Sequence, residues 1–123
     1  MKKIWIIGLA VLAIVVFLFV YTFGSPNLIS AAEGKRRIAS GEINLILDVR
    51  TFAERELLGY YPGSVHIPAG DLAREFPKKF PMKNVSVLIY CNTGQRARAA
   101  TDTLVSLGYP NVVYIAGSHM SLL

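Results

Sequence analysis

The chain has 123 residues, with 13 Lys or Arg and 8 Asp or Glu, and a formal net charge of +5. Its basic residues are scattered and form no basic stripe with interleaved aromatics, so we expect no nucleic-acid partner. A single cysteine excludes an internal disulfide and a zinc site built from several thiolates. This length fits one domain plus an appendage.

The N-terminal segment is the most apolar part of the chain. Residues 4–23 contain no charged side chain and follow two lysines. As a helix, this run is long enough to cross a hydrocarbon core of about 30 Å. One interpretation is a signal peptide cleaved after Ala32, within the small-residue run that starts at Ser30, and the other is an uncleaved transmembrane anchor. The length of the run and its distance from Ala32 favour the anchor.

The expected organisation is an anchor or signal segment over residues 1–23, a linker over 24–30 and a folded domain over 31–123. The two N-terminal lysines favour a cytoplasmic N-terminus, whereas the basic cluster at residues 35–37 favours the reverse. Because the lysines lie nearer the apolar run, which looks like an export signal, we expect the domain to face the periplasm or the outside. A chain cleaved after Ala32 would instead be secreted to the periplasm.

Hydrophobic periodicity predicts alternating helices and strands beyond the linker. The expected helices cover residues 28–40, 52–58, 71–76 and 97–107, and the expected strands cover 45–48, 65–67, 85–90 and 112–115. Thr51 and Glu54 form a capping box. Pro77 and Pro81 are expected to bracket a basic loop. Continuous apolar strands that alternate with helices predict an α/β fold with a doubly wound parallel sheet of four or five strands flanked by helices.

The second apolar strand ends at Cys91, at the sheet edge where open α/β folds bind ligands. The loop that follows consists of Asn92, Thr93, Gly94 and Gln95. It leads into a helix N-terminus, where backbone N–H groups and the helix dipole attract anions. Gly94 allows a tight turn, and Arg96 adds a permanent positive charge. Such surroundings can lower a cysteine pKa to roughly 3.5–7.5, so we expect Cys91 to be a reactive thiolate.

Five segments, taken in order, have the pattern of one protein family. They are Leu47-Asp48-Val49-Arg50 with Glu54 after it, Gly59-Tyr60-Tyr61-Pro62-Gly63-Ser64-Val65-His66-Ile67-Pro68, Tyr90-Cys91-Asn92-Thr93-Gly94-Gln95-Arg96, Leu107-Gly108-Tyr109 and Ala116-Gly117. Together they resemble the single-domain rhodaneses, which are sulfurtransferases. The chain is most similar to the short exported rhodaneses of the phage-shock type, which also have asparagine directly after the cysteine.

The resemblance implies a rhodanese-like fold and thiosulfate sulfurtransferase activity. Cys91 would take sulfane sulfur from a small anionic donor, carry it as a persulfide and pass it to a thiol or cyanide; a protein acceptor also fits. Backbone N–H groups of the loop would hold the donor, and Arg96 would bind its negative charge. Asp48 and Arg50 would support the site as an ion pair that fixes loops. No metal or organic cofactor is expected.

Three alternatives stay open. The first is a phosphatase or arsenate reductase, which is disfavoured because four residues rather than five separate Cys91 from Arg96. The second is a catalytically weak, membrane-tethered binding module, and the third is a redox role in which oxidised Cys91 reports oxidants. Among the other polar residues, Glu54 is explained as a helix cap, His66 as a satisfied strand residue and His119 as a surface residue.

Overall fold

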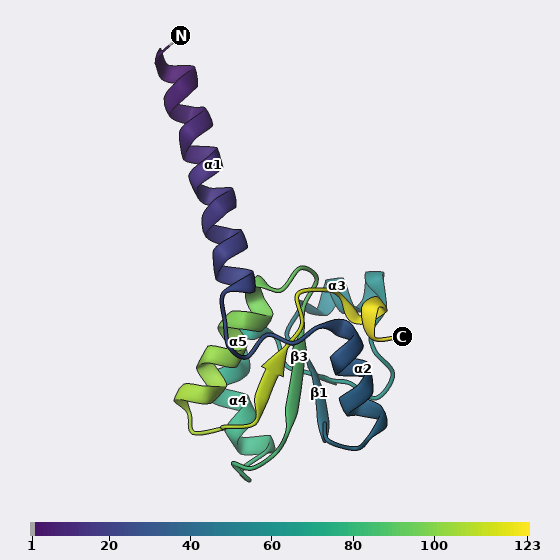
Figure 1. The fold of residues 1–123 in the computed structure, drawn as a ribbon. Coiled ribbons are helices and arrows are strands. Elements are labelled where there is room, and N and C mark those ends of the chain that lie inside the picture. Colours follow the sequence, from purple (N-terminus) through teal and green to yellow (C-terminus); the bar gives the residue numbers. More distant parts are fainter. Residues whose placement is uncertain (1) are drawn as a thin grey trace.

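The computed structural model describes residues 2–123, as one long helix that projects from an α/β domain (Figure 1). The α-helices are α1 (Lys2–Phe23), α2 (Ala31–Ala39), α3 (Phe52–Leu58), α4 (Leu72–Lys79) and α5 (Gln95–Ser106). Two short 3₁₀ helices are η1 (Ala69–Asp71) and η2 (His119–Leu122). The strands are β1 (Leu45–Asp48), β2 (Val65–His66), β3 (Val87–Tyr90) and β4 (Val112–Tyr114).

The four strands form one parallel sheet in the order β2-β1-β3-β4, which confirms the predicted fold class. In the register of the sheet, Asp48 at the end of β1 is level with Tyr90 at the end of β3 and with His66 of β2. The carboxyl ends of the central strands therefore meet at one edge. The loops after β1 and β3 both start from this edge.

Helices cover both faces of the sheet (Figure 1). Val87 and Ile89 of β3 belong to the same core cluster as the buried residues of α4 and α5. Leu88 and Tyr90 lie in the other cluster, which Leu122 of η2 and Ile38 of α2 help to form. Successive side chains of a strand point to opposite faces, so β3 needs apolar residues at every position and is buried throughout.

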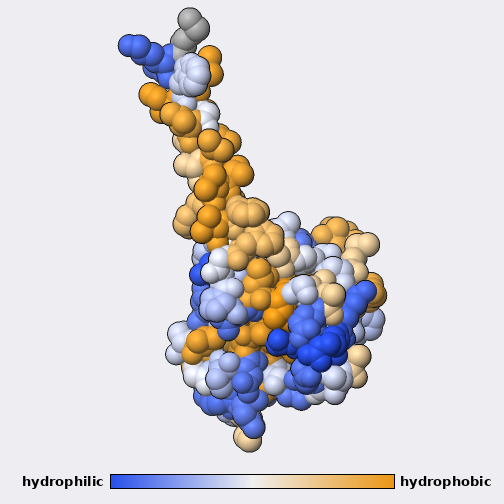
Figure 2. All heavy atoms as spheres, viewed as in Figure 1, coloured by the Kyte–Doolittle hydropathy of each residue, from blue (hydrophilic) through white to orange (hydrophobic). Residues whose placement is uncertain are grey.

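Helix α1 is 22 residues long, begins with two lysines and is predominantly apolar from Ile4 onward (Figure 2). Its most apolar window has a mean hydropathy of 2.9, and none of that window is buried. At about 1.5 Å per residue the helix is about 33 Å long, enough to cross a bilayer. The predicted N-terminal apolar helix is therefore present, with the dimensions of a membrane span or signal segment.

The residues between α1 and α2 run along β4. Leu28 forms an isolated parallel bridge with Tyr114. The N–H of Ile29 donates to the carbonyl of Tyr114 at 2.9 Å, and the N–H of Tyr114 donates to the carbonyl of Asn27 at 3.0 Å. The prediction that a helix starts at Leu28 is wrong, because these extended residues pair with the sheet. Helix α2 begins at Ala31, after Ser30 accepts a capping hydrogen bond.

A second difference concerns the loop predicted around Pro77. Helix α4 continues to Lys79 and contains Pro77, so the basic residues that follow this proline are helical. The N–H of Phe80 donates to the carbonyl of Phe76 at 2.8 Å, and their rings lie 5.0 Å apart. These contacts hold the last turn together although Pro77 lacks an N–H donor.

Candidate active site

Cys91 follows the last residue of β3 and is 1% exposed. Its Sγ accepts a hydrogen bond from the N–H of Gly94 at 3.1 Å. Gly94 has a φ of 109°, a left-handed conformation that glycine adopts without steric cost, and α5 begins at the next residue. The loop therefore wraps around the sulfur. The first turn of α5, whose N–H groups have no partner within the helix, begins directly after this contact.

Arg96 is held by Glu54 of α3. Its two terminal nitrogens donate to the two carboxylate oxygens of Glu54 at 2.6 and 2.7 Å. The side-chain amide of Asn92 donates to the same carboxylate at 2.6 Å. The hydrogen bonds from Arg96 lower the pKa of Glu54 to about 2, so this carboxylate is ionised at neutral pH. Asn92 of the Cys91 loop and Arg96 of α5 are thus both bound to α3.

The interpretation of Glu54 as a helix cap alone was incomplete. The predicted capping box is present, with the N–H of Glu54 donating to Thr51 and the N–H of Thr51 donating back to Glu54, both at 3.2 Å. The same carboxylate also binds Arg96 and Asn92 from α5 and its loop. The resemblance pointed to Glu54 as part of a motif, but no spacing in the sequence connects it with residues about forty positions away.

Asp48 and Arg50 form the expected ion pair, and both side chains are fully buried. Nε and Nη2 of Arg50 donate to the two carboxylate oxygens of Asp48 at 3.0 and 2.8 Å. Burial raises the pKa of Asp48, but the hydrogen bonds from Arg50 and Tyr90 outweigh it and hold that pKa below its usual value. Arg50 also donates to the carbonyl of Gly59 at 2.6 Å and to Asn92 at 3.4 Å. The pair therefore connects the loop after β1 with the Cys91 loop.

Two further residues that the sequence analysis did not select complete this network. The hydroxyl of Tyr90 donates to Asp48 at 2.9 Å and accepts from the N–H of Tyr61 at 3.2 Å. Arg55 of α3 donates to Asp48 at 3.1 Å and to Ser64 at 3.0 Å. Because a buried carboxylate is stable only when its lone pairs are satisfied, these donors belong to the support of the site.

The two histidines differ in their surroundings. Nε2 of His66 lies 2.6 Å from the carbonyl oxygen of Arg50, which agrees with a satisfied strand residue. His119 was predicted to lie at the surface, and this prediction is wrong, because its side chain is 6% exposed and packs 6.0 Å from the ring of Tyr90. Helix η2 folds back so that Leu122 enters the core. Burial lowers the pKa of His119.

The C-terminal end of α1 also contacts the Cys91 loop and α5. Thr22 is 1% exposed, and its hydroxyl accepts a hydrogen bond from the amide of Gln95 at 3.0 Å. The guanidinium of Arg98 donates to the carbonyl of Tyr21 and stacks over the Tyr21 ring at 4.3 Å. The apolar helix is therefore joined to the start of α5 by specific contacts. No feature of the sequence linked residues of the apolar run to this loop.

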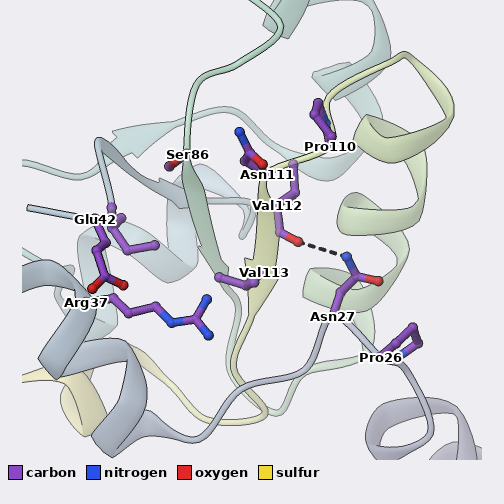
Figure 3. Close-up of a pocket in the computed structure, with 10 residues that line it drawn as sticks. Pro26, Asn27, Arg37, Glu42, Ser86, Pro110, Asn111, Val112 and Val113 are labelled. Carbon is purple, nitrogen blue, oxygen red and sulfur yellow. Dashed lines mark hydrogen bonds between the residues drawn. The ribbon is translucent and has the colours of Figure 1, made fainter.

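A cavity of about 360 Å³ lies at the other end of the sheet (Figure 3). Its walls include Ser86 and Asn111, which come just before β3 and β4, and Arg37 of α2. The side-chain amide of Asn27 donates to the carbonyl of Val112 at 2.9 Å on one side of it. Ligands of open parallel sheets bind at the carboxyl ends of the strands, so this cavity is not the candidate active site.

The comparison with known families matches residues 30–121 to the rhodanese-like domain. A mouse protein named thiosulfate sulfurtransferase/rhodanese-like domain-containing protein 3 is 31% identical over 104 residues, covering 76% of this chain and 66% of that protein. The putative sulfur carrier protein YrkF of Bacillus subtilis is 32% identical over 87 residues, or 71% of this chain and 45% of its own length. The chain therefore spans between about half and two thirds of these two relatives.

Two further relatives are of comparable size. The thiosulfate sulfurtransferase PspE of Escherichia coli is 30% identical over 71 residues, which are 58% of this chain and 67% of PspE. Among solved structures, the human single-domain sulfurtransferase TSTD1 superimposes with a TM-score of 0.67 at 27% identity, covering 79% of this chain and 95% of that one. The residues matched to the rhodanese-like domain, 30–121, include the candidate site.

Proposed function

Because this chain belongs to the family of rhodanese-like domains, we propose that it is a sulfurtransferase that carries sulfane sulfur on Cys91. The observation that carries the proposal is the hydrogen bond from the N–H of Gly94 to Cys91 Sγ, inside a loop that opens a helix. Backbone N–H groups and the helix dipole stabilise negative charge on sulfur. A thiolate held in this way needs no separate general base.

The proposed reaction has two steps. The Cys91 thiolate attacks the outer sulfur of thiosulfate, the S–S bond breaks, and sulfite leaves with the bonding electron pair. Cys91 then carries a persulfide, and an acceptor thiolate or cyanide attacks its outer sulfur and releases the Cys91 thiolate. The steps balance with the donor and the acceptor alone. Because Cys91 is 1% exposed, we expect the wrapped loop to open locally for each transfer.

Arg96 has the role of binding the donor anion in this proposal. Its side chain is 39% exposed, although Glu54 binds its two terminal nitrogens. The ion pair fixes the guanidinium close to the loop. The neighbouring N–H groups of residues 92–96 supply the remaining donors, as pre-aimed dipoles that need no rearrangement during the reaction. Asp48 and Arg50 act as positioning residues, since their contacts reach Asn92 rather than the sulfur.

We further propose that α1 is an uncleaved anchor and that the domain faces the periplasm or the outside. The contacts of residues 22–29 support the uncleaved anchor. Cleavage after Ala32 would remove the Ser30 cap of α2 and the hydrogen bonds of Asn27 and Ile29 to Tyr114. The N-terminal lysines support the orientation. Intact mass of the chain purified from membranes tests this, because a chain beginning at Glu33 would contradict the anchor.

The sulfur-transfer proposal is tested by intact mass. The full chain in detergent is incubated with thiosulfate and desalted, and its intact mass is measured by mass spectrometry, with Cys91→Ala as the control. A gain of one sulfur atom that is absent from the control and is discharged by cyanide supports the proposal. A folded protein that gains no sulfur from several sulfane donors would instead favour a binding module.

A further inference from the structure

The domain exposes large apolar side chains mainly on two elements. Leu57 of α3 is 82% exposed, and Phe52 of the same helix is 69% exposed. Met120 of η2 is 69% exposed, and the C-terminal Leu123 is 63% exposed. We use the name apolar end face for the six exposed side chains on or next to α3 and η2: Phe52, Leu57, Leu58, Tyr60, Met120 and Leu123.

The two elements adjoin, and they lie at the end of the domain where α1 enters. A Cβ added to Gly59, just after α3, would lie 3.5 Å from Nε2 of His119 in η2. Figure 1 places α3 and the C-terminus at the same end of the domain as the junction with α1. In Figure 2, hydrophobic surface at this end is level with the lower part of α1. The exposed apolar residues are thus gathered on one side of the domain.

Apolar surface also continues between the end of α1 and the apolar end face. A cavity of about 420 Å³ lies between Phe23, the last residue of α1, and Ser121 of η2. Leu28, Ile29 and Ile115 line its walls. The hydrophobic surface of α1 therefore extends past its last turn toward η2.

The direction of α1 relative to the domain is held by contacts. Thr22 is buried against the Cys91 loop through Gln95, and Arg98 binds both the carbonyl and the ring of Tyr21. The carbonyl of Thr22 also accepts a hydrogen bond from the hydroxyl of Tyr114. A helix that crosses a bilayer and is attached in this way brings the same end of the domain to the lipid surface.

We propose that the apolar end face rests on the bilayer that α1 crosses. Burial of apolar surface lowers the free energy, so these side chains are stabilised when they enter the interfacial region. The Cys91 loop contacts α1 through Gln95 and α3 through Asn92, so it lies between the anchor and this face. The active site then works at the lipid surface. This inference rests on the membrane anchor of the proposed function, and it does not depend on sulfur transfer.

The test measures lipid contact at single positions of the full chain in phosphatidylcholine vesicles. Cys91→Ser is combined, one at a time, with Leu57→Cys, Met120→Cys, Val15→Cys or Met82→Cys, and each cysteine is labelled with an environment-sensitive fluorophore. Met82 is the matched control, since it is 68% exposed but lies between α4 and β3, at the amino end of the strands. Near-ultraviolet circular dichroism checks that each variant is folded. Quenching by lipids brominated at shallow or deep acyl positions is the readout.

We expect shallow bromines to quench the label at Leu57 and Met120 at least threefold more than the label at Met82. Deep bromines should quench the label at Val15. Quenching at Val15 with equal, weak quenching at Leu57 and Met82 would overturn the inference and leave the anchor standing. Absence of quenching at Val15 would remove the anchor and the inference with it. A blue-shifted but unquenched label at Leu57 would also overturn the inference, because a protein partner or a second copy would then cover the face.

Discussion

Glu54 of α3 binds Arg96 of α5 through two hydrogen bonds of 2.6 and 2.7 Å, and it also binds Asn92 of the loop between β3 and α5. This single carboxylate therefore connects the helix after β1 with the loop after β3. Arg50 of the neighbouring buried pair, Asp48 and Arg50, also contacts Asn92. The Cys91 loop is held on one side by this chain of contacts and on the other by α1.

Replacement of Glu54 by alanine should destabilise the protein. The change removes the side-chain half of the capping box and leaves Arg96 and Asn92 without their carboxylate acceptor, and hydrogen bonds to charged groups contribute about 1.5–3 kcal/mol. Because Arg96 is partly exposed, we expect a loss of about 1–2 kcal/mol. Glu56→Ala, at an exposed position of the same helix, should change the stability by less than about 0.5 kcal/mol. Urea unfolding in detergent measures both, and equal losses would show that Glu54 acts only through α3 itself.

Arg96→Lys should lower kcat/KM for thiosulfate about tenfold, which corresponds to about 1.4 kcal/mol of transition-state stabilisation. Lysine keeps the charge but cannot bind the Glu54 carboxylate in the two-pronged geometry, so the positive charge loses its fixed place. The matched control is Arg74→Lys on α4, where the arginine side chain is 63% exposed. Steady-state assays with cyanide as acceptor make the comparison. An unchanged rate in Arg96→Lys would mean that charge alone matters at this position.

Gly94→Ala should strongly impair folding and sulfur transfer. A left-handed φ of 109° disfavours alanine by about 1–2 kcal/mol. The added Cβ would also lie 2.8 Å from Cγ2 of Thr22 and 2.9 Å from the Cα of Ala116, and a backbone atom cannot easily move away. Gly70→Ala meets no atom within 4 Å and serves as the control. Thermal unfolding and persulfide formation are the readouts; a variant of Gly94 that matches the control in both would contradict this view of the loop.

The stability of the protein should fall as the pH drops below about 6.5. Burial lowers the pKa of His119 below the ordinary histidine value of about 6.5, so the unfolded state binds this proton first. The stabilisation from neutral His119 is complete above pH 6.5 and is lost as the pH falls toward the lowered pKa of the folded state. Unfolding midpoints between pH 7 and pH 5 measure this slope, and His119→Gln should flatten it. An identical slope in the variant would assign the effect to other groups.

The stabilisation that Glu54 contributes is lost over a lower pH range than that of His119. Arg96 lowers the pKa of Glu54 from 4.5 to about 2, so its stabilisation is present above pH 4.5 and is lost as the pH falls from 4.5 toward 2. We expect Glu54→Ala to reduce the loss of stability in this lower range and to leave the slope between pH 7 and 5 unchanged. The same unfolding series, extended to pH 3, measures it. A change of slope above pH 5 in Glu54→Ala would contradict the separation of the two groups.

The sequence by itself determined the fold class and the position of Cys91. Continuous apolar runs such as Val87–Tyr90 are stable only where a sheet is covered on both faces, and their alternation with helices allows few arrangements. The turn at Gly94 and the ion pair of Asp48 with Arg50 are local features, so they could be anticipated from neighbouring residues. The apolar helix was equally clear, because a run of this length without charge is visible in any window of the sequence.

Only the tertiary structure decided which distant residues meet at the site. Glu54 and Arg96, or Thr22 and Gln95, are brought together by parallel strands whose ends share an edge and by the segment that runs along β4. The burial of His119 likewise depends on η2 folding back onto Tyr90. Local patterns record the preferences of neighbouring residues, whereas these contacts depend on the packing of whole elements. A pattern along the chain therefore located the candidate cysteine, but packing alone showed what holds its loop in place.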